Sequence, residues 1–120
     1  MRVAVYGTLR QGFHNHYILG PSTFLGTGKT VDKTTMYSNG GFPIMSLTKP
    51  TVEAVVEVYE VDDVITQARL DRLEGYPEWY NRSIIPVQLD SGEVVDAWIY
   101  HQEDMTYQLP IVQSGDWASK

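Results

Sequence analysis

Short β-forming runs separated by turns make up most of this sequence, and this division limits the fold more than any other feature. Ser38-Asn39-Gly40-Gly41 and Asp90-Ser91-Gly92 are strong turn signals, and the second predicts a hairpin between the runs that flank it. The run at 51–59 alternates, which places its even-numbered apolar residues on one face of a strand. We expect strands at residues 3–5, 23–31, 34–37, 42–45, 51–59, 81–89 and 94–100.

One clear helix is predicted between residues 62 and 73. Asp62 or Asp63 can cap its amino end, and Gly75 stands where a left-handed residue ends a helix before Pro77. Its apolar residues fall on two faces, which predicts two short segments or contacts on two sides: Val61, Val64, Ile65 and Ala68 on one, Leu70 and Leu73 on the other.

The remaining segments complete a single α+β arrangement. Residues 11–20 suggest one or two helical turns, and residues 102–120 an irregular tail anchored by apolar side chains. Pro86 removes one ladder hydrogen bond from the run at 81–89 and so predicts a sheet edge or a bulge. We therefore expect one α+β domain over residues 1–120, with a small, largely antiparallel, barrel-like sheet.

Composition favours small-molecule chemistry. A formal charge of −6 and a pI near 4.8 argue against a surface for nucleic acid or anionic membranes. The absence of cysteine excludes a disulfide framework, a thiolate nucleophile and a cysteine-based zinc site. The first strand begins directly after Met1, with no signal-peptide pattern, and no apolar run reaches membrane-spanning length, so we expect a cytoplasmic protein.

The opening stretch at 3–10 runs from an apolar strand straight into a polar turn. Gly7 allows either a positive φ or the close approach of another group to the backbone. The turn is open to two interpretations. It can be an ordinary strand end, or the backbone N–H groups of Gly7, Thr8 and Leu9 can form a concavity that binds a carboxylate or another anion.

Glu74 is the first candidate for acid/base chemistry. It stands at the carboxyl end of the predicted helix, where the partial negative charge of the last carbonyls opposes its ionised form. The alternative is a solvated surface glutamate. Tyr76, Tyr80 and Arg82 follow closely, and they can pack at the core edge or form an ion pair. Arg82 can also neutralise a substrate carboxylate or hold Glu74, and a tyrosine can orient an amine or an oxyanion.

Other catalytic patterns are incomplete. His14 and His16 have i, i+2 spacing, and only His101 could join them, so the ligand set of a metal site is not complete. No serine has a nucleophile-elbow context, and the phosphate-binding glycine loops are absent.

Three separated segments coincide with one family. Val5-Tyr6-Gly7-Thr8-Leu9-Arg10, followed by Gly12 and Asn15, resembles the opening signature of γ-glutamylcyclotransferase-like (AIG2-like) proteins. The segment 70–77, Leu-Asp-Arg-Leu-Glu-Gly-Tyr-Pro, with Tyr80 and Arg82 behind it, is similar to their second motif. Residues 114–117, Ser-Gly-Asp-Trp, are similar to the tail of many members.

The resemblance implies a strand barrel flanked by short helices and a pocket framed by the opening loop. It also implies a reaction in which the α-amine of a γ-glutamyl compound attacks its own γ-carbonyl, so that 5-oxoproline forms and the amine, amino acid or peptide on the other side leaves. Carried over, Glu74 is the general acid/base, and Tyr6, Gly7, Thr8 and Leu9 hold the glutamyl end or the oxyanion. Such chemistry needs no metal, cofactor or protein nucleophile, because the attack is intramolecular.

One departure and two alternatives accompany this expectation. Relatives commonly have glycine where Val56 stands, so a branched side chain is expected to narrow the pocket there. A non-catalytic small-molecule or protein-binding module that keeps the pocket is the main alternative. A metal-dependent hydrolase that uses His14, His16 and His101 is the third. We expect a small γ-glutamyl substrate, with neither nucleic acid nor membrane as a partner, and the oligomeric state stays open.

Overall fold

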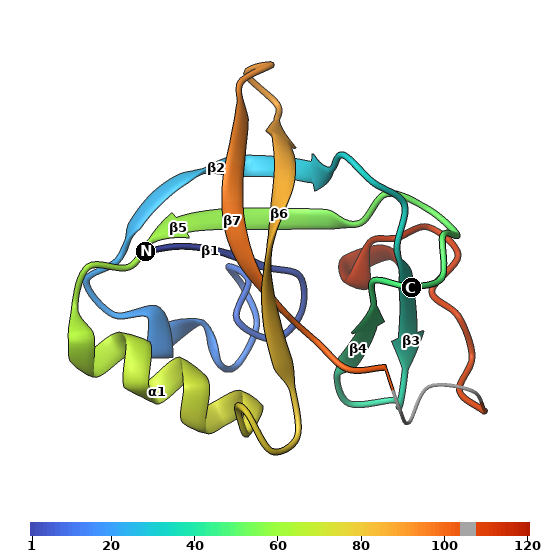
Figure 1. Ribbon diagram of the computed structural model, residues 1–120, viewed down its shortest axis with the longest axis horizontal. Helices are drawn as coiled ribbons and strands as arrows, with labels where there is room; N and C mark the ends of the chain where they lie inside the picture. Colours follow the sequence, from blue (N-terminus) through green and yellow to red (C-terminus); the bar gives the residue numbers. More distant parts are fainter. Residues whose placement is uncertain (104–107) are drawn as a thin grey trace.

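Five strands close into a barrel in the computed structural model, which describes residues 1–103 and 108–120. The order around the barrel is β1-β5-β2-β6-β7. Figure 1 shows β6 and β7 as a long hairpin that crosses the other three strands, with α1 on one side and a small second sheet on the other. The barrel strands are β1 (Arg2–Val5), β2 (Thr23–Thr30), β5 (Val55–Glu60), β6 (Asn81–Leu89) and β7 (Val94–His101).

β1 closes the barrel by pairing with β5 on one edge and with β7 on the other. It lies antiparallel to β5 from Arg2 to Val5, and parallel to β7 at Val3. Val3, Ala4 and Val5 are all buried, as their uninterrupted apolar run predicts for a strand covered on both faces. The barrel-like, largely antiparallel sheet predicted from the sequence is therefore confirmed, with a single parallel pairing.

β5 is shorter than the strand predicted over residues 51–59. The structure begins β5 at Val55, and the regular ladder does not continue through the four preceding residues. Val52 bridges to Thr34, and the Ala54 N–H donates to the Thr30 hydroxyl at 2.9 Å. Alternation alone does not reveal this change of partner, because both arrangements bury alternate residues.

Pro86 lies in β6 at a position where one edge of the strand is not paired with another strand. β6 pairs with β7 along its length, but with β2 only from Val87 to Leu89. Pro86 lies immediately outside the second pairing, at an edge of the ladder as predicted. The turn after β6 forms the expected hairpin with β7.

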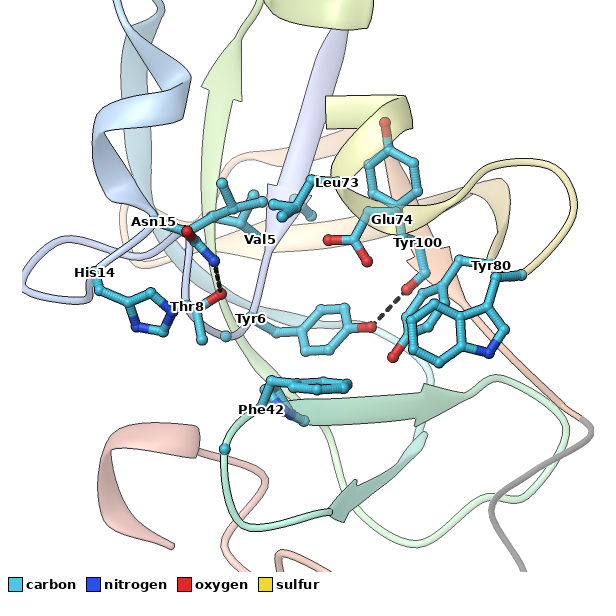
Figure 2. Close-up of a pocket in the computed structure, with 16 residues that line it drawn as sticks. Val5, Tyr6, Thr8, His14, Asn15, Phe42, Leu73, Glu74, Tyr80 and Tyr100 are labelled. Carbon is cyan, nitrogen blue, oxygen red and sulfur yellow. Dashed lines mark hydrogen bonds between the residues drawn. The ribbon is translucent and has the colours of Figure 1, made fainter. Parts of the chain in front are cut away.

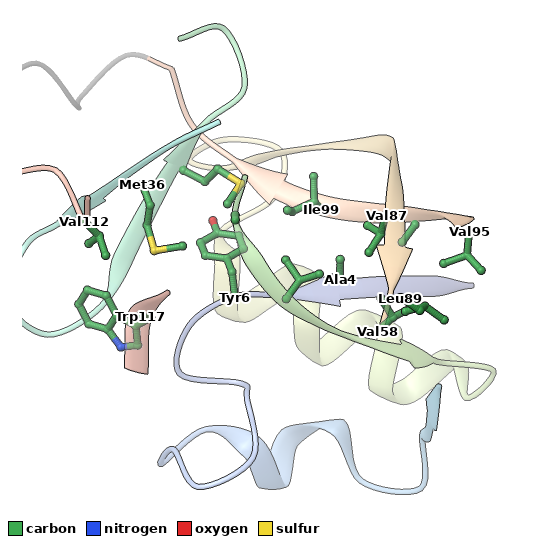
Figure 3. Packing of buried hydrophobic residues seen from close by; sticks show 14 residues of the cluster. Ala4, Tyr6, Met36, Val58, Val87, Leu89, Val95, Ile99, Val112 and Trp117 are labelled. Atoms are coloured by element: carbon green, nitrogen blue, oxygen red, sulfur yellow. The ribbon is translucent and has the colours of Figure 1, made fainter. Parts of the chain in front are cut away.

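A two-stranded sheet of β3 (Thr35–Ser38) and β4 (Pro43–Ser46) packs beside the barrel. Its methionines Met36 and Met45 are fully buried, and they share one apolar cluster with barrel residues such as Val58 and with Trp117 of the tail (Figure 3). The cluster is therefore continuous between the two sheets. Trp117 begins a short 3-10 helix, η2 (Trp117–Ser119).

α1 (Val64–Glu74) is one helix and not two segments. Asp63 caps its amino end by accepting from the Thr66 N–H at 3.2 Å, and Gly75 ends it with φ 65°. The predicted stripe is only partly correct, because Val64 and Ile65 are exposed while Leu70 is fully buried. No helix in the described residues is long and apolar enough to cross a membrane.

Two predicted segments differ in extent. Residues 11–20 contain one 3-10 turn, η1 (His16–Leu19). The tail predicted at 102–120 is largely irregular where it is described, and residues 104–107 lie outside the described residues.

Candidate active site

A cavity of about 170 Å³ lies between the loop after β1, the end of α1 and the turn that precedes β4. Figure 2 shows Glu74 and Tyr6 facing this space, with Phe42 on the opposite wall. The cavity is lined by Ala4, Val5, Tyr6, Gly7, Thr8, Leu9, His14, Asn15, Gly41, Phe42, Pro43, Leu73, Glu74, Trp79, Tyr80 and Tyr100.

The opening loop carries three unused donors. In the described residues, the backbone N–H groups of Gly7, Thr8 and Leu9 make no hydrogen bond to another protein group. The carbonyls of the loop are occupied, since Gly7 O accepts from Arg10 N and Thr8 O from Asn15 N, each at 3.0 Å. The Asn15 amide also donates to the Thr8 hydroxyl at 3.0 Å, so the loop is held in shape while its N–H groups stay available.

Gly7 is required by a close approach and not by a positive φ. A Cβ at this position would lie 2.6 Å and 2.7 Å from two ring carbons of Pro43, well inside van der Waals contact. The loop can therefore lie directly against the first residue of β4. This contact places the β3–β4 turn, and Phe42 with it, at the edge of the cavity.

Arg10 anchors the loop from behind. Its guanidinium pairs with Glu57 at 3.4 Å and with Asp116 at 2.7 Å, and its side chain is only 10% exposed. Glu57 also accepts from Gln11 N at 3.0 Å and from the Tyr59 hydroxyl at 2.9 Å. The opening motif and the tail motif are thus joined through Arg10 and Asp116, two residues for which the sequence predicts no role.

Glu74 enters the cavity from the last turn of α1. Gly75 reverses the chain immediately after it in the left-handed conformation. Burial raises the pKa of Glu74 to about 7, whereas the helix terminus was the cause expected from the sequence. No hydrogen bond or ion pair joins Glu74 to another described residue, so its carboxyl group is free to exchange a proton with a ligand.

Two tyrosines face the same space as protonated groups. Burial raises the pKa of Tyr6 and of Tyr80 well above the usual value, and the nearby Glu74 carboxylate adds to the effect at Tyr80. The Tyr6 hydroxyl donates to the Tyr100 carbonyl at 2.7 Å. The Tyr80 hydroxyl makes no hydrogen bond within the described residues and is therefore available to a ligand.

Arg82 does not join these residues. It is absent from the cavity lining and instead pairs with Asp71, with Nη1 at 3.0 Å from Oδ1 and 3.2 Å from Oδ2. Its guanidinium stacks over the rings of Tyr76 and Trp98, at 4.4 Å and 5.0 Å from their centroids. The sequence suggested that Arg82 neutralises a substrate carboxylate or holds Glu74. In the structure Arg82 contacts neither the cavity nor Glu74.

Several lining residues carry no signal in the sequence. Phe42 and Trp79 form an aromatic edge, with ring centroids 6.4 Å apart, although they come from separate loops.

His14 lines the cavity, whereas His16 bonds to the Leu9 carbonyl and His101 to Ser83 and Glu103. The three histidines are therefore not gathered, and the described residues hold no group of three possible metal ligands.

Val56 does not narrow the cavity. Its side chain is fully buried in the barrel core, opposite Gly28 of β2, and it is not among the lining residues. The expectation that this branched residue shapes the pocket is wrong, because β5 turns the side chain of Val56 into the barrel.

Comparison with known proteins identifies the family. A family model described as "Gamma-glutamyl cyclotransferase, AIG2-like" matches residues 3–119. The chain belongs to this family. The resemblance expected from the three separated motifs is therefore confirmed over nearly the whole sequence.

Similar proteins match most of this chain. A Methanocaldococcus jannaschii protein named "Putative gamma-glutamylcyclotransferase MJ1514" is 43% identical over 116 residues, which span 96% of this chain and 93% of that protein. A Danio rerio protein named "Gamma-glutamylaminecyclotransferase B" is 30% identical over 110 residues, 82% of this chain and 57% of that protein. The crystal structure of an aig2-like protein from Mus musculus superimposes with a TM-score of 0.79 at 27% identity, covering 93% of this chain and 85% of that one.

Proposed function

We propose that this protein is a cofactor-independent γ-glutamyl cyclotransferase that releases 5-oxoproline from a γ-glutamyl amine, amino acid or related amide. One observation carries the proposal. A carboxyl group with a pKa of about 7 and three backbone N–H groups line the same cavity, and none of them hydrogen-bonds to another described residue. Family membership supports the general class of reaction.

The reaction removes two protons from the substrate's α-ammonium group, and Glu74 carries one of them to the leaving nitrogen. The Glu74 carboxylate accepts a proton from the substrate's α-ammonium group, and the free amine then attacks the γ-carbonyl carbon of the same molecule. A new C–N bond closes the five-membered ring, and the ring nitrogen releases its second proton to water. The bond to the leaving nitrogen breaks as that nitrogen takes the first proton back from Glu74, and the released amine then takes up a proton from water. A carboxyl pKa of about 7 suits both roles, because a general acid/base works best near the operating pH.

The opening loop stabilises negative charge on the substrate, and Tyr80 orients the substrate. The N–H groups of Gly7, Thr8 and Leu9 hold the substrate carboxylate or the oxyanion that develops on the γ-carbonyl. The Tyr80 hydroxyl, a protonated donor in the same cavity, orients the glutamyl group. No lysine or arginine occurs among the described lining residues, so oriented dipoles carry the binding of the anion.

The aromatic edge is assigned to the leaving group. Phe42 and Trp79 present apolar rings at the side of the cavity, and Trp79 is 47% exposed. Such rings suit the carbon chain of an amine. The name of the Danio rerio relative specifies γ-glutamyl amines, which is consistent with this assignment.

The proposal is tested by incubating the protein with a panel of γ-glutamyl amines and γ-glutamyl amino acids and measuring 5-oxoproline. The wild type should release it, and Glu74→Gln should lower kcat by about 10²–10⁴-fold, the usual contribution of a general acid/base. Glu78→Gln is the matched control, because Glu78 is exposed and four residues away. Turnover of no panel member, with binding retained, would favour the binding-module alternative, and an active Glu74→Gln variant would overturn the role of Glu74.

A further inference from the structure

The helix that carries Glu74 has little apolar burial of its own. Within α1, only Thr66 and Leu70 are buried, and Leu73, which precedes Glu74, is 38% exposed. Val64 and Ile65 at the other end are exposed as well. Apolar packing therefore fixes the middle of α1 and leaves its last turn to be positioned by other contacts.

Polar contacts supply that position through Asp71, which lies one helical turn before Glu74. The Asp71 carboxylate accepts from Arg82 at 3.0 Å and 3.2 Å, and from the Tyr100 hydroxyl at 2.7 Å. Burial, followed by the hydrogen bond to Asp71, raises the pKa of Tyr100 well above its usual value, so its hydroxyl stays protonated and donates. Arg82 and Asp71 are 21% and 27% exposed, so water competes weakly for their contact.

Arg82 itself contacts two aromatic rings. Its guanidinium stacks over Tyr76, which follows the end of α1, and over Trp98 of β7. A planar, delocalised cation suits this stacked position better than an ammonium group would. Arg82 of β6 therefore connects the barrel hairpin to the last turn of α1 on a side that the cavity does not reach.

Tyr100 joins this cluster to the cavity wall. Figure 2 shows its ring directed towards the end of α1, while its backbone carbonyl faces Tyr6. The carbonyl accepts from the Tyr6 hydroxyl at 2.7 Å, and the ring hydroxyl donates to Asp71. One residue of β7 thus sets the distance between the two sides of the cavity, the opening strand and the helix of Glu74.

We propose that Asp71, Arg82 and Tyr100 are positioning residues, which hold the last turn of α1 against β7 and so fix how deeply Glu74 enters the cavity. This inference rests on the proposed function where kcat and KM are measured, but not where the titration of Glu74 is measured. Loosening the cluster lets the last turn of α1 move towards solvent, and Glu74 with it. The carboxyl group then becomes better hydrated, and its geometry relative to the Gly7–Leu9 loop is lost.

Tyr100→Phe is the sharpest variant, because it removes one hydroxyl and keeps both the ring and the carbonyl that binds Tyr6. Asp71→Asn removes the charge that pairs with Arg82. We expect each to lower kcat by about 10- to 100-fold with a smaller change in KM, since a misplacement near 1 Å costs about this much. We also expect the ascending limb of the pH profile of kcat/KM to move to lower pH. Tyr17→Phe is the matched control, because Tyr17 is 77% exposed.

A direct titration keeps this test independent of turnover. In protein labelled with ¹³C at the glutamate carboxyl carbon, the Glu74 resonance, assigned from Glu74→Gln, should titrate at lower pH in Tyr100→Phe and Asp71→Asn than in the wild type. If the wild type releases no 5-oxoproline but this shift is seen, the positioning role stands and the proposed function fails. If both variants only lower the unfolding temperature, with kcat and the Glu74 titration as in the wild type and in Tyr17→Phe, the positioning role is refuted.

Discussion

Replacing Glu74 by glutamine should stabilise the protein while it lowers kcat. A carboxyl group whose pKa is raised from 4.5 to about 7 by burial is costly to ionise in the folded state. At roughly 1.4 kcal/mol per pH unit, this difference corresponds to about 3 kcal/mol. Glutamine has nearly the same shape and carries no charge, so it avoids this cost.

The contribution of Glu74 to the free energy of unfolding changes with pH. Below pH 4.5 the carboxyl group is protonated in both the folded and the unfolded chain, and it contributes no difference in stability. As the pH rises from 4.5 to about 7, the unfolded chain ionises first, so the free energy of unfolding falls by the full amount. Above about 7 both states are ionised, and the loss is complete.

Urea unfolding at several pH values between 4.5 and 8 measures this directly. The stability of Glu74→Gln minus that of the wild type should grow by about 3 kcal/mol across the range, whatever its starting value. Glu78→Gln should follow the wild type, because Glu78 is exposed. A difference that does not change with pH would refute the conclusion that burial raises the pKa of Glu74, and with it the match to acid/base work near neutral pH.

Three further substitutions follow from close contacts and hydrogen bonds. Gly7→Ala places a methyl group against the Pro43 ring, so the free energy of unfolding measured in urea should fall by about 1–3 kcal/mol and substrate KM should rise. Unchanged values would show that β4 can shift away from the loop at no cost. Gly28→Ala should cost at least as much, because the new Cβ meets backbone atoms of Gln88 that cannot rotate away, and a tolerated alanine would contradict the β2–β6 pairing. Burial opposes ionisation of Glu103, but its hydrogen bonds hold its pKa at about 2. Glu103→Gln should therefore lower the free energy of unfolding fully at pH 7 and by less below pH 4.5. A loss of stability that does not change with pH would exclude this ionic contribution.

The strands and the helix ends were predictable because their signals are local. The Asp63 cap and the left-handed Gly75 each act within a few residues of the helix they limit. The β6–β7 hairpin follows from a turn signal between two β-forming runs. The start of β5 was not predictable in this way, since Val52 pairs with Thr34 across a long separation in sequence.

The site divides along the same line. The sequence by itself determined the family and, through its motifs, drew attention to Glu74 and to the loop at Gly7. Only the tertiary structure decided that these two groups share a cavity, that burial raises the pKa of Glu74, and that Arg82 acts on Asp71. The physical reason is that desolvation and ion pairing depend on which atoms surround a group, and those atoms come from distant parts of the chain.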